Sequence, residues 1–286
     1  MSRESAVFFR AGRFTASLTT SIPSVLAGIK QLYPISNRQD DFADFHIALK
    51  KRRWYSPQVL FSLNNRQPFS PLPYGQALPL LEWGLNWCVT QHYHQALVMH
   101  AAVVEKAGKA LILPGSPGSG KSTLCAALVS AGGWRLFSDE LALVALDTPW
   151  LEPNPRPISL KNRSIDIIKE FSCGQIFTES VKDTLKGTVA HMCPPQNATS
   201  QWQQGAEPAL IIFPKYQQGV KSNLQPVSAG AAFMRLVENS FNYHILGAAG
   251  FRAMAGLMDK VRCFDYVYDG NLEHAIGQCD ELVANV

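Results

Sequence analysis

The sequence has little of what marks membrane, secreted or nucleic-acid-binding proteins. No window approaches the roughly eighteen consecutive apolar residues that a membrane-spanning helix needs. The opening stretch MSRESAVFFRAGRF is charged and lacks the apolar centre of a secretory signal. Lys and Arg are dispersed, with one short cluster at 50–53, whereas nucleic-acid grooves carry a denser basic stripe. We therefore expect a cytoplasmic protein that binds neither nucleic acid nor a membrane.

The cysteines are few and scattered. There are six, with no C-x-x-C pair and no spacing with histidine that would suit zinc. This pattern predicts reduced thiols. The 286 residues are 47% hydrophobic and 17% charged, with a net charge of +4, which is the composition of a globular chain. The length fits one domain with an extension, or two domains.

The chain changes character near residue 75. Residues 1–75 are predicted to be β-rich, with strands in RFTASLTT and FADFHIAL and two short strands in PQVLFSLNNRQPF around Asn64 and Asn65. The Pro-rich stretch QPFSPLPYGQALP marks a boundary, and LPLLEWGLNWC has helical spacing. Residues 76–286 then form a second predicted domain.

Strands and helices intermix in this second region, which predicts an α/β fold. We expect two strands around the turn at 105–109, a helix in KSTLCAALVSAGG and further strands in WRLFSDELALVAL. SIDIIKEF is predicted as a helix capped by Ser164, PALIIFPKY as a buried strand, and 228–260 as mostly helical. A strand in CFDYVYD and a helix in NLEHAIGQCDELVANV close the chain.

One motif carries specific chemistry. Gly115 to Ser122 reads G-x-x-x-x-G-K-S between an apolar strand and a helix, which is the setting of a phosphate-binding loop. Glycines let the backbone N–H groups approach phosphate oxygens, and the helix N-terminus favours anions. Lys121 is then expected to reach the β- and γ-phosphates, and Ser122 to bind Mg²⁺. The predicted nucleotide-binding residues are Gly115, Ser116, Pro117, Gly118, Ser119, Gly120, Lys121, Ser122 and Thr123.

Two other interpretations of this motif are weaker. A dinucleotide fingerprint fails at Thr123, where a small Gly or Ala is wanted, and it gives Lys121 no role. A chance glycine-rich turn does not account for the strand-to-helix setting. ATP or another nucleoside triphosphate, with Mg²⁺, is therefore the expected ligand.

Paired acids follow the loop helix. Asp139 and Glu140 end the apolar strand in WRLFSDEL, and we expect this strand to lie beside the strand that precedes the loop. Its carboxyl end would then face the phosphates, where one acid can hold metal and the other can act on the substrate. A solvent-exposed turn is the alternative. His100 precedes the loop strand, and such a histidine is more often a packed residue than a catalyst.

With His100, Gly115–Ser122 and the Asp139–Glu140 pair, the chain resembles the HPr kinase/phosphorylase family, which phosphorylates a serine of a small carrier protein. A looser resemblance, from about residue 80 onward, is to the divergent branch called HPr kinase-related kinase A. It is carried by LLEWGLNWC, HAAVVE, PGSGKSTLCAALV, SDELAL, PRPISLKNRSIDII, KGTVAH, FPKY and NSFNYHILGAAGF. The resemblance implies a P-loop core of the PEP carboxykinase-like type with a smaller β-rich N-terminal region.

The resemblance also implies roles and partners. Asp139 looks like the base that takes the proton of the acceptor hydroxyl, Glu140 like a metal or supporting acid, and His100 like the histidine near the transferring phosphate. A small protein or peptide acceptor is implied, with a PqqD-like neighbour as one candidate. A homo-oligomer is also implied, because HPr kinases are hexamers.

The chain departs from the family at one signature. The later glutamate-arginine-glycine motif is absent, and PRPISLKNRS stands in its place, which puts phosphorylase activity in doubt. Arg156, Lys161 and Arg163 could supply charge to the transition state instead, or serve solubility. KGTVAHMCPP is predicted as a loop that carries two further substrate candidates, Lys186 and His191.

Three functions fit these residues. The first is a kinase that moves the γ-phosphoryl group of a nucleoside triphosphate to a hydroxyl of a protein, peptide or small molecule. The second is a motor or switch NTPase, for which LFSDE would be the acidic strand. The third is a nucleotide-dependent peptide-binding module without chemistry, against which the intact Lys121, Ser122 and Asp139 argue.

Overall fold

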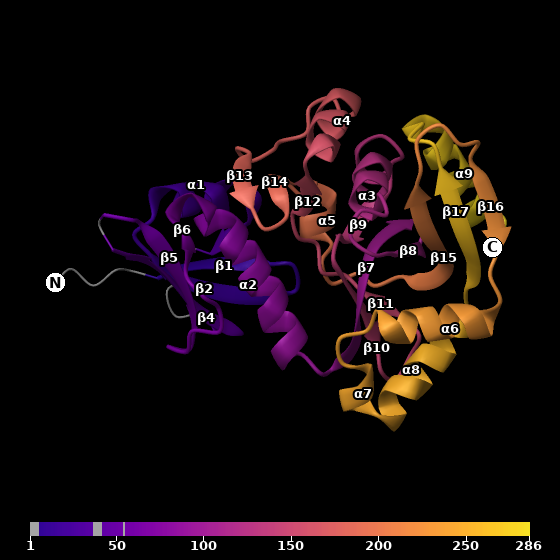
Figure 1. Ribbon diagram of the computed structural model, residues 1–286. Helices are drawn as coiled ribbons and strands as arrows, with labels where there is room; N and C mark the ends of the chain where they lie inside the picture. Colours follow the sequence, from indigo (N-terminus) through magenta and orange to yellow (C-terminus); the bar gives the residue numbers. More distant parts are fainter. Residues whose placement is uncertain (1–5, 37–41, 54) are drawn as a thin grey trace.

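The computed structural model describes residues 6–36, 42–53 and 55–286. Strands and helices are interspersed along this part of the chain, which confirms the predicted α/β class. Figure 1 shows an N-terminal sheet and a larger central sheet, with a small third sheet between them. Within the described ranges, no helix is both long and apolar enough to cross a membrane.

The N-terminal sheet buries one face against helices. Its order is β3-β1-β2-β4-β5-β6, with β1 at Val7–Ala11, β2 at Phe14–Thr20, β3 at Ile35–Ser36, β4 at Phe45–Arg52, β5 at Gln58–Leu63 and β6 at Leu72–Pro73. Buried and half-buried residues alternate along β5, as expected for a strand with one face in the core. Helices α1 (Pro23–Leu32) and α2 (Ala77–His92) supply the apolar side chains that pack on that face.

In this region one helix was not predicted, and one predicted strand was wrong. Helix α1 was not expected, although Pro23 at its start and the buried Val25, Ile29 and Leu32 follow helical spacing. The strand expected after Asn64 and Asn65 is absent from the described chain there, where only a single bridge joins Leu63 to Arg66. The chain instead returns to β5 through the short β6, and η1 (Tyr74–Gln76) then leads into α2.

Helix α2 lies on the C-terminal side of the boundary predicted at residue 75, yet it packs on the N-terminal sheet. Leu81 and Leu85 share a core with Phe61 of that sheet. The same core extends to Val98 and Leu143 of the central sheet. Apolar packing is therefore continuous between the two sheets, and the boundary itself remains a prediction.

The central sheet has the order β11-β10-β7-β8-β15-β17-β16, and β9 also pairs with β7. Its strands are β7 (Ala96–Lys106), β8 (Lys109–Pro114), β9 (Arg135–Ser138), β10 (Leu141–Ala145), β11 (Leu151–Glu152), β15 (Glu207–Tyr216), β16 (Asn223–Pro226) and β17 (Arg262–Tyr268). The predicted hairpin around 105–109 is confirmed as β7 and β8. Strand β15 runs parallel to both β8 and β17.

The predicted neighbour of β8 was wrong. Strand β9 does not lie beside β8, because β7 separates the two. Both pair with β7 in the antiparallel sense, so β8 and β9 run in the same direction. Their carboxyl ends consequently reach the same edge of the sheet, as the prediction required. The presence of β7 increases the distance between the carboxyl ends of β8 and β9, but these two strands still point in the same direction.

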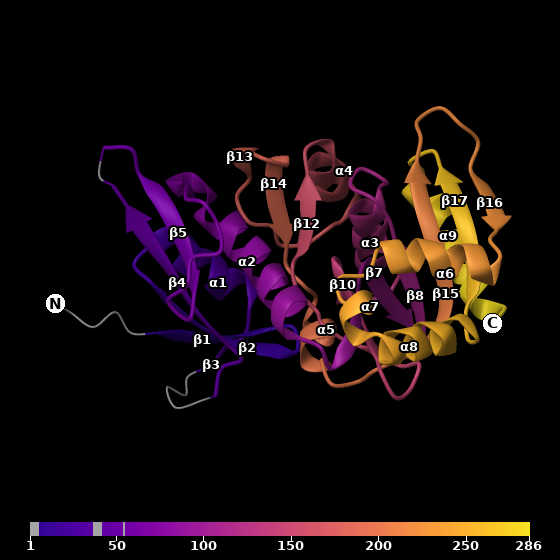
Figure 2. The same ribbon diagram turned by 60° about the horizontal axis from the view of Figure 1, so that its bottom comes forward.

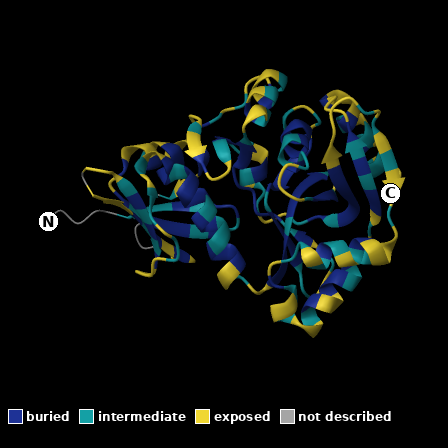
Figure 3. Ribbon diagram, in the orientation of Figure 1, coloured by how far each residue is buried: buried dark blue, intermediate teal, exposed yellow. Residues whose placement is uncertain are grey.

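Helices cover both faces of the central sheet, as Figure 2 shows. Their bounds are α3 at Lys121–Ser130, α4 at Arg163–Phe171, α5 at Gln196–Ser200, α6 at Ala229–Glu238, α7 at Tyr243–Leu246, α8 at Ala248–Met258 and α9 at Leu272–Ala284. Helices α3, α4 and α9 share one apolar core with the sheet, and α6 and α8 share another. Buried residues concentrate in the strands and on the inner helix faces (Figure 3).

The third sheet has the order β12-β14-β13, with β12 at Ile158–Lys161, β13 at Val181–Thr184 and β14 at Gly187–Met192. The loop predicted for KGTVAHMCPP was therefore wrong for His191, which lies in β14 and is buried. The predicted cap was also wrong, because α4 is preceded by Asn162 and the Ser164 hydroxyl donates to the Lys161 carbonyl. All six cysteines, each within the described ranges, are unpaired thiols, as expected.

Candidate functional site

The glycine-rich loop, residues 115–120, is a tight turn between β8 and α3. Gly118 and Gly120 have φ values of 86° and 87°, a conformation that side-chain-bearing residues rarely adopt. The loop is tied internally by the bond from the Ser119 N–H to the Ser116 carbonyl (3.1 Å). A Cβ placed on Gly115 would lie 2.5 Å from the Ser119 hydroxyl oxygen. This loop therefore needs glycine at the motif positions because of its geometry.

The loop leads directly into the first turn of α3. The free backbone N–H groups of a helix N-terminus attract anions. Lys121 begins the helix and is only 7% exposed. Its Nζ lies 3.1 Å from Nε2 of His100 on β7. Ser122 and Thr123, the next two predicted residues, are half-buried in the same turn.

His100 acts as a neutral partner of Lys121. Burial, together with the positive charge of Lys121, lowers its pKa to about 4. The ring is therefore uncharged near neutral pH, and Nε2 accepts a hydrogen bond from the lysine ammonium. The His100 backbone N–H donates to the carbonyl of Asn239 (2.7 Å), and its ring packs 6.1 Å from that of Phe241. The segment after α6 thus borders the site.

Asp139 follows β9 at the same sheet edge as the loop. Its side chain is 2% exposed, and Oδ2 accepts a hydrogen bond from the Ser159 N–H (2.9 Å). Burial raises the pKa of its carboxyl group, and the Glu140 charge adds to the rise, whereas Lys121 and Ser122 oppose it. Oδ1 is buried and has no hydrogen-bond partner of its own in the described chain.

Glu140 is the opposite case. Burial opposes its ionisation, but Lys121, Lys186 and Lys161 outweigh it and lower the pKa of the carboxyl group to about 2. Lys161 Nζ lies 3.8 Å from Oε1, and Asn86 Nδ2 lies 3.4 Å from Oε2. The two adjacent acids therefore differ in chemistry: Asp139 holds a proton more readily than usual, and Glu140 stays ionised.

The structure brings some of the substrate candidates to the loop and not others. Lys161 lies 3.8 Å from Glu140, and the charge of Lys186 also acts on this carboxylate. Arg156 is instead locked in a buried ion pair with Glu82 of α2 (2.7 Å), which raises its pKa further. Arg163 is exposed at the start of α4.

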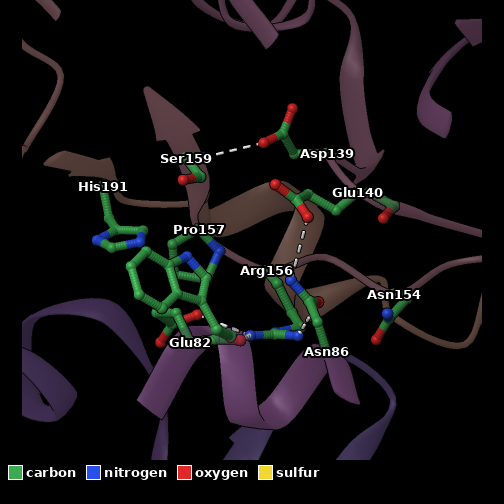
Figure 4. Close-up of a pocket in the computed structure, with 11 residues that line it drawn as sticks. Glu82, Asn86, Asp139, Glu140, Asn154, Arg156, Pro157, Ser159 and His191 are labelled. Carbon is green, nitrogen blue, oxygen red and sulfur yellow. Dashed lines mark hydrogen bonds and ion pairs between the residues drawn. The ribbon is translucent and has the colours of Figure 1, made fainter. Parts of the chain in front are cut away.

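A small cavity lies behind the acids, between α2 and β12 (Figure 4). Its volume is about 20 Å³, enough for a water molecule. Several buried polar atoms of its lining residues have no hydrogen-bond partner in the described chain: Trp83 Nε1, Arg156 Nε, Ser159 Oγ and His191 Nε2. His191 pairs with Ser159 across the β12–β14 ladder, and burial lowers its pKa. His191 therefore belongs to this cavity.

Helix α2 contributes residues that the sequence did not suggest. Asn86 contacts both Glu140 and Arg156, and Lys186 lies over the Trp83 ring (5.3 Å from its centroid). The sequence offered no indication of a role for Asn86. The spacing of Glu82, Trp83 and Asn86 places them on neighbouring turns, which is the one local signal that they act together.

Comparison with known proteins adds no assignment: no protein-family model matches the chain, and no curated protein is significantly similar to it.

Proposed function

We propose that the protein is a Mg²⁺-dependent kinase that transfers the γ-phosphoryl group of a nucleoside triphosphate to a hydroxyl of a protein, peptide or small molecule. Its core would be a P-loop fold of the HPr kinase type. One observation carries the proposal: the buried carboxyl group of Asp139 lies beside Lys121 and Ser122 of the glycine-rich motif. A base next to a phosphate cradle is the arrangement that phosphoryl transfer requires.

The residues present fit a nucleotide with its metal. The loop backbone and the first turn of α3 supply N–H groups for phosphate oxygens. Lys121 supplies a positive charge that His100 orients. Mg²⁺ prefers oxygen ligands and usually takes one or two from the protein, with the rest from phosphates and water. The Ser122 hydroxyl is an oxygen of this kind, and Glu140 supplies a carboxylate nearby. Bound Mg²⁺ would neutralise charge on the phosphates.

The proton chemistry falls to Asp139. Its raised pKa makes it a better proton acceptor than an ordinary aspartate, and its burial keeps bulk water away. Glu140, held ionised, keeps Lys161 and Lys186 at the site, where their charges can stabilise the transferring group. Asp139 is accordingly assigned the removal of the acceptor hydroxyl proton, and Lys121 the stabilisation of charge.

The test follows labelled phosphate. Purified protein is incubated with γ-labelled ATP, with and without a candidate small acceptor protein such as a PqqD-like neighbour. Label on the acceptor supports the kinase, whereas free phosphate alone indicates an NTPase. Nucleotide binding without any turnover indicates a binding module.

Variants make the test specific to the site. Asp139→Asn should keep nucleotide affinity and lower transfer by about 10²-fold to 10⁴-fold, the usual contribution of a general base. Lys121→Ala should weaken nucleotide binding itself. Asp166→Asn and Lys182→Ala, both exposed, are the matched controls. Transfer at the normal rate by Asp139→Asn would overturn the assignment of the base.

A further inference from the structure

The topology sets the direction in which a bound nucleotide would lie. Strand β8 leads into the glycine-rich loop, with β7 and β9 on one side of it and β15 and β17 on the other. Asp139 stands at the carboxyl end of β9. A terminal phosphate directed at Asp139 would therefore place the nucleoside on the opposite side, toward the carboxyl ends of β15 and β17. Those ends are Tyr216 and Tyr268.

Tyr216 is attached to the loop. Its backbone N–H donates to the Ser119 carbonyl (2.9 Å), and its Cβ lies 3.0 Å from where a Cβ on Gly120 would stand. Tyr268 lies beneath it, with its hydroxyl donating to the Gly120 carbonyl (3.0 Å). Tyr268 is 1% exposed, but Tyr216 is 39% exposed. One tyrosine therefore supports the loop from inside, and the other is partly exposed to solvent beside it.

The Tyr216 ring is also held in place. It lies against the backbone of Gly270, where an added Cβ would come within 2.9 Å of the ring carbon Cε2. The Tyr268 ring packs at a tilt, 5.7 Å away, and the next backbone N–H, that of Gln217, donates to the Tyr268 carbonyl (2.9 Å). An aromatic ring fixed before binding loses little conformational entropy when a flat ligand stacks on it.

We propose that Tyr216 is the platform on which the base of the bound nucleotide stacks. This inference rests on the proposed nucleotide-binding function and extends it by assigning the nucleoside subsite. Stacking uses the face of the base and not its hydrogen-bonding edge, so the platform would accept different bases.

The experiment compares two probes that share phosphates but differ in the base. Calorimetry with Mg²⁺ measures the Kd of ADP and of inorganic tripolyphosphate for the wild type and for Tyr216→Phe, Tyr216→Leu and Tyr216→Ala. The loss of a stacked base typically weakens binding by about tenfold or more. We expect that loss of ADP affinity in Tyr216→Leu and Tyr216→Ala, near-normal affinity in Tyr216→Phe, and unchanged tripolyphosphate affinity in all three. Leu185→Ala, at an exposed position, is the control.

Other outcomes overturn the proposal in distinguishable ways. An equal loss for both probes would mean that Tyr216 only supports the loop. Unchanged ADP affinity in Tyr216→Ala would mean that the base lies elsewhere. In either case the proposed function would stand. A wild-type protein that binds neither probe would overturn the proposed function together with this subsite.

Discussion

At the scale of single residues, the two adjacent acids show that local surroundings alone can give similar carboxyl groups different pKa values. Asp139 and Glu140 are neighbours in sequence, yet the pKa of one carboxyl group is raised and that of the other falls to about 2. Burial opposes the ionisation of both groups, but Lys121, Lys186 and Lys161 together outweigh it at Glu140, whereas at Asp139 burial outweighs the effect of Lys121. Only the first group is suited to take and release a proton.

A pH profile tests this division. If ionised Asp139 is the base, transfer should rise with pH through a pKa above the ordinary aspartate range. The Glu140 charge helps to raise that pKa, so Glu140→Gln should move the acid limb of kcat/KM to lower pH. The exposed Glu170→Gln should leave the limb in place. A limb that stays fixed, or moves to higher pH, in Glu140→Gln would contradict the coupling.

His100 provides a stability test. Its pKa is lowered to about 4 in the folded protein, whereas an unfolded histidine titrates near 6.5. Between pH 4 and pH 6.5 the unfolded chain therefore binds more protons than the folded protein. Neutral His100 contributes its full free energy of folding above about pH 6.5, and this contribution is lost as the pH falls toward 4. In urea unfolding, His100→Gln should lose less stability over this window than the wild type. The exposed His94→Gln should behave as the wild type. The prediction would be refuted if the free energy of unfolding changed equally with pH in all three proteins.

At the scale of elements, the junction of the glycine-rich loop and α3 is the most constrained point. Gly120 has φ of 87°, and a Cβ there would collide with the Tyr268 hydroxyl. Gly219 has a similar φ of 78° but open space around it. Substituting each glycine with alanine therefore distinguishes the effect of backbone strain from the effect of a collision with Tyr268.

We expect Gly120→Ala to suffer both backbone strain and the collision, and Gly219→Ala to suffer backbone strain alone. Strain of this kind costs on the order of 1–3 kcal/mol. Gly120→Ala should lower the melting temperature more than Gly219→Ala and should also weaken binding of Mg²⁺-ADP, which Gly219→Ala should leave unchanged. Calorimetry and thermal melts measure both quantities. Equal behaviour of the two variants would show that Tyr268 does not constrain the loop.

At the scale of the whole molecule, α2 links the N-terminal sheet to the site. The Tyr33 hydroxyl donates to Glu82 (2.7 Å), which also pairs with Arg156 near β12. One turn farther along, Asn86 reaches Glu140. The N-terminal region thus supports the wall of the site from behind, a role that its own sequence did not reveal.

The buried pair predicts a large effect of a conservative change. Glu82→Gln removes the charge that balances Arg156, and breaking a buried pair typically costs about 3–5 kcal/mol. We expect the free energy of unfolding in urea to fall by about this amount. Glu170→Gln, an exposed change of the same type, should have little effect. Wild-type stability in Glu82→Gln would show that Arg156 is neutralised in another way.

The sequence by itself determined the local features of this protein. The glycines at 115, 118 and 120, followed by Lys121, indicated a loop entering a helix, because the constraint on backbone conformation lies within a few residues. The β7–β8 hairpin, β15, β17 and α9 followed from apolar periodicity in the same way.

The tertiary structure alone decided which distant segments of the chain come into contact. Strand β7 lies between β8 and β9, and Asn86 of α2 contacts Glu140. Arg156, which the sequence suggested as a substrate residue, instead forms an ion pair with Glu82. The tertiary structure also placed Tyr216 beside Gly120, although nearly a hundred positions separate them in the printed sequence. Strand order and burial depend on pairing and packing between distant segments, and no local pattern of residue types encodes which distant partner is chosen.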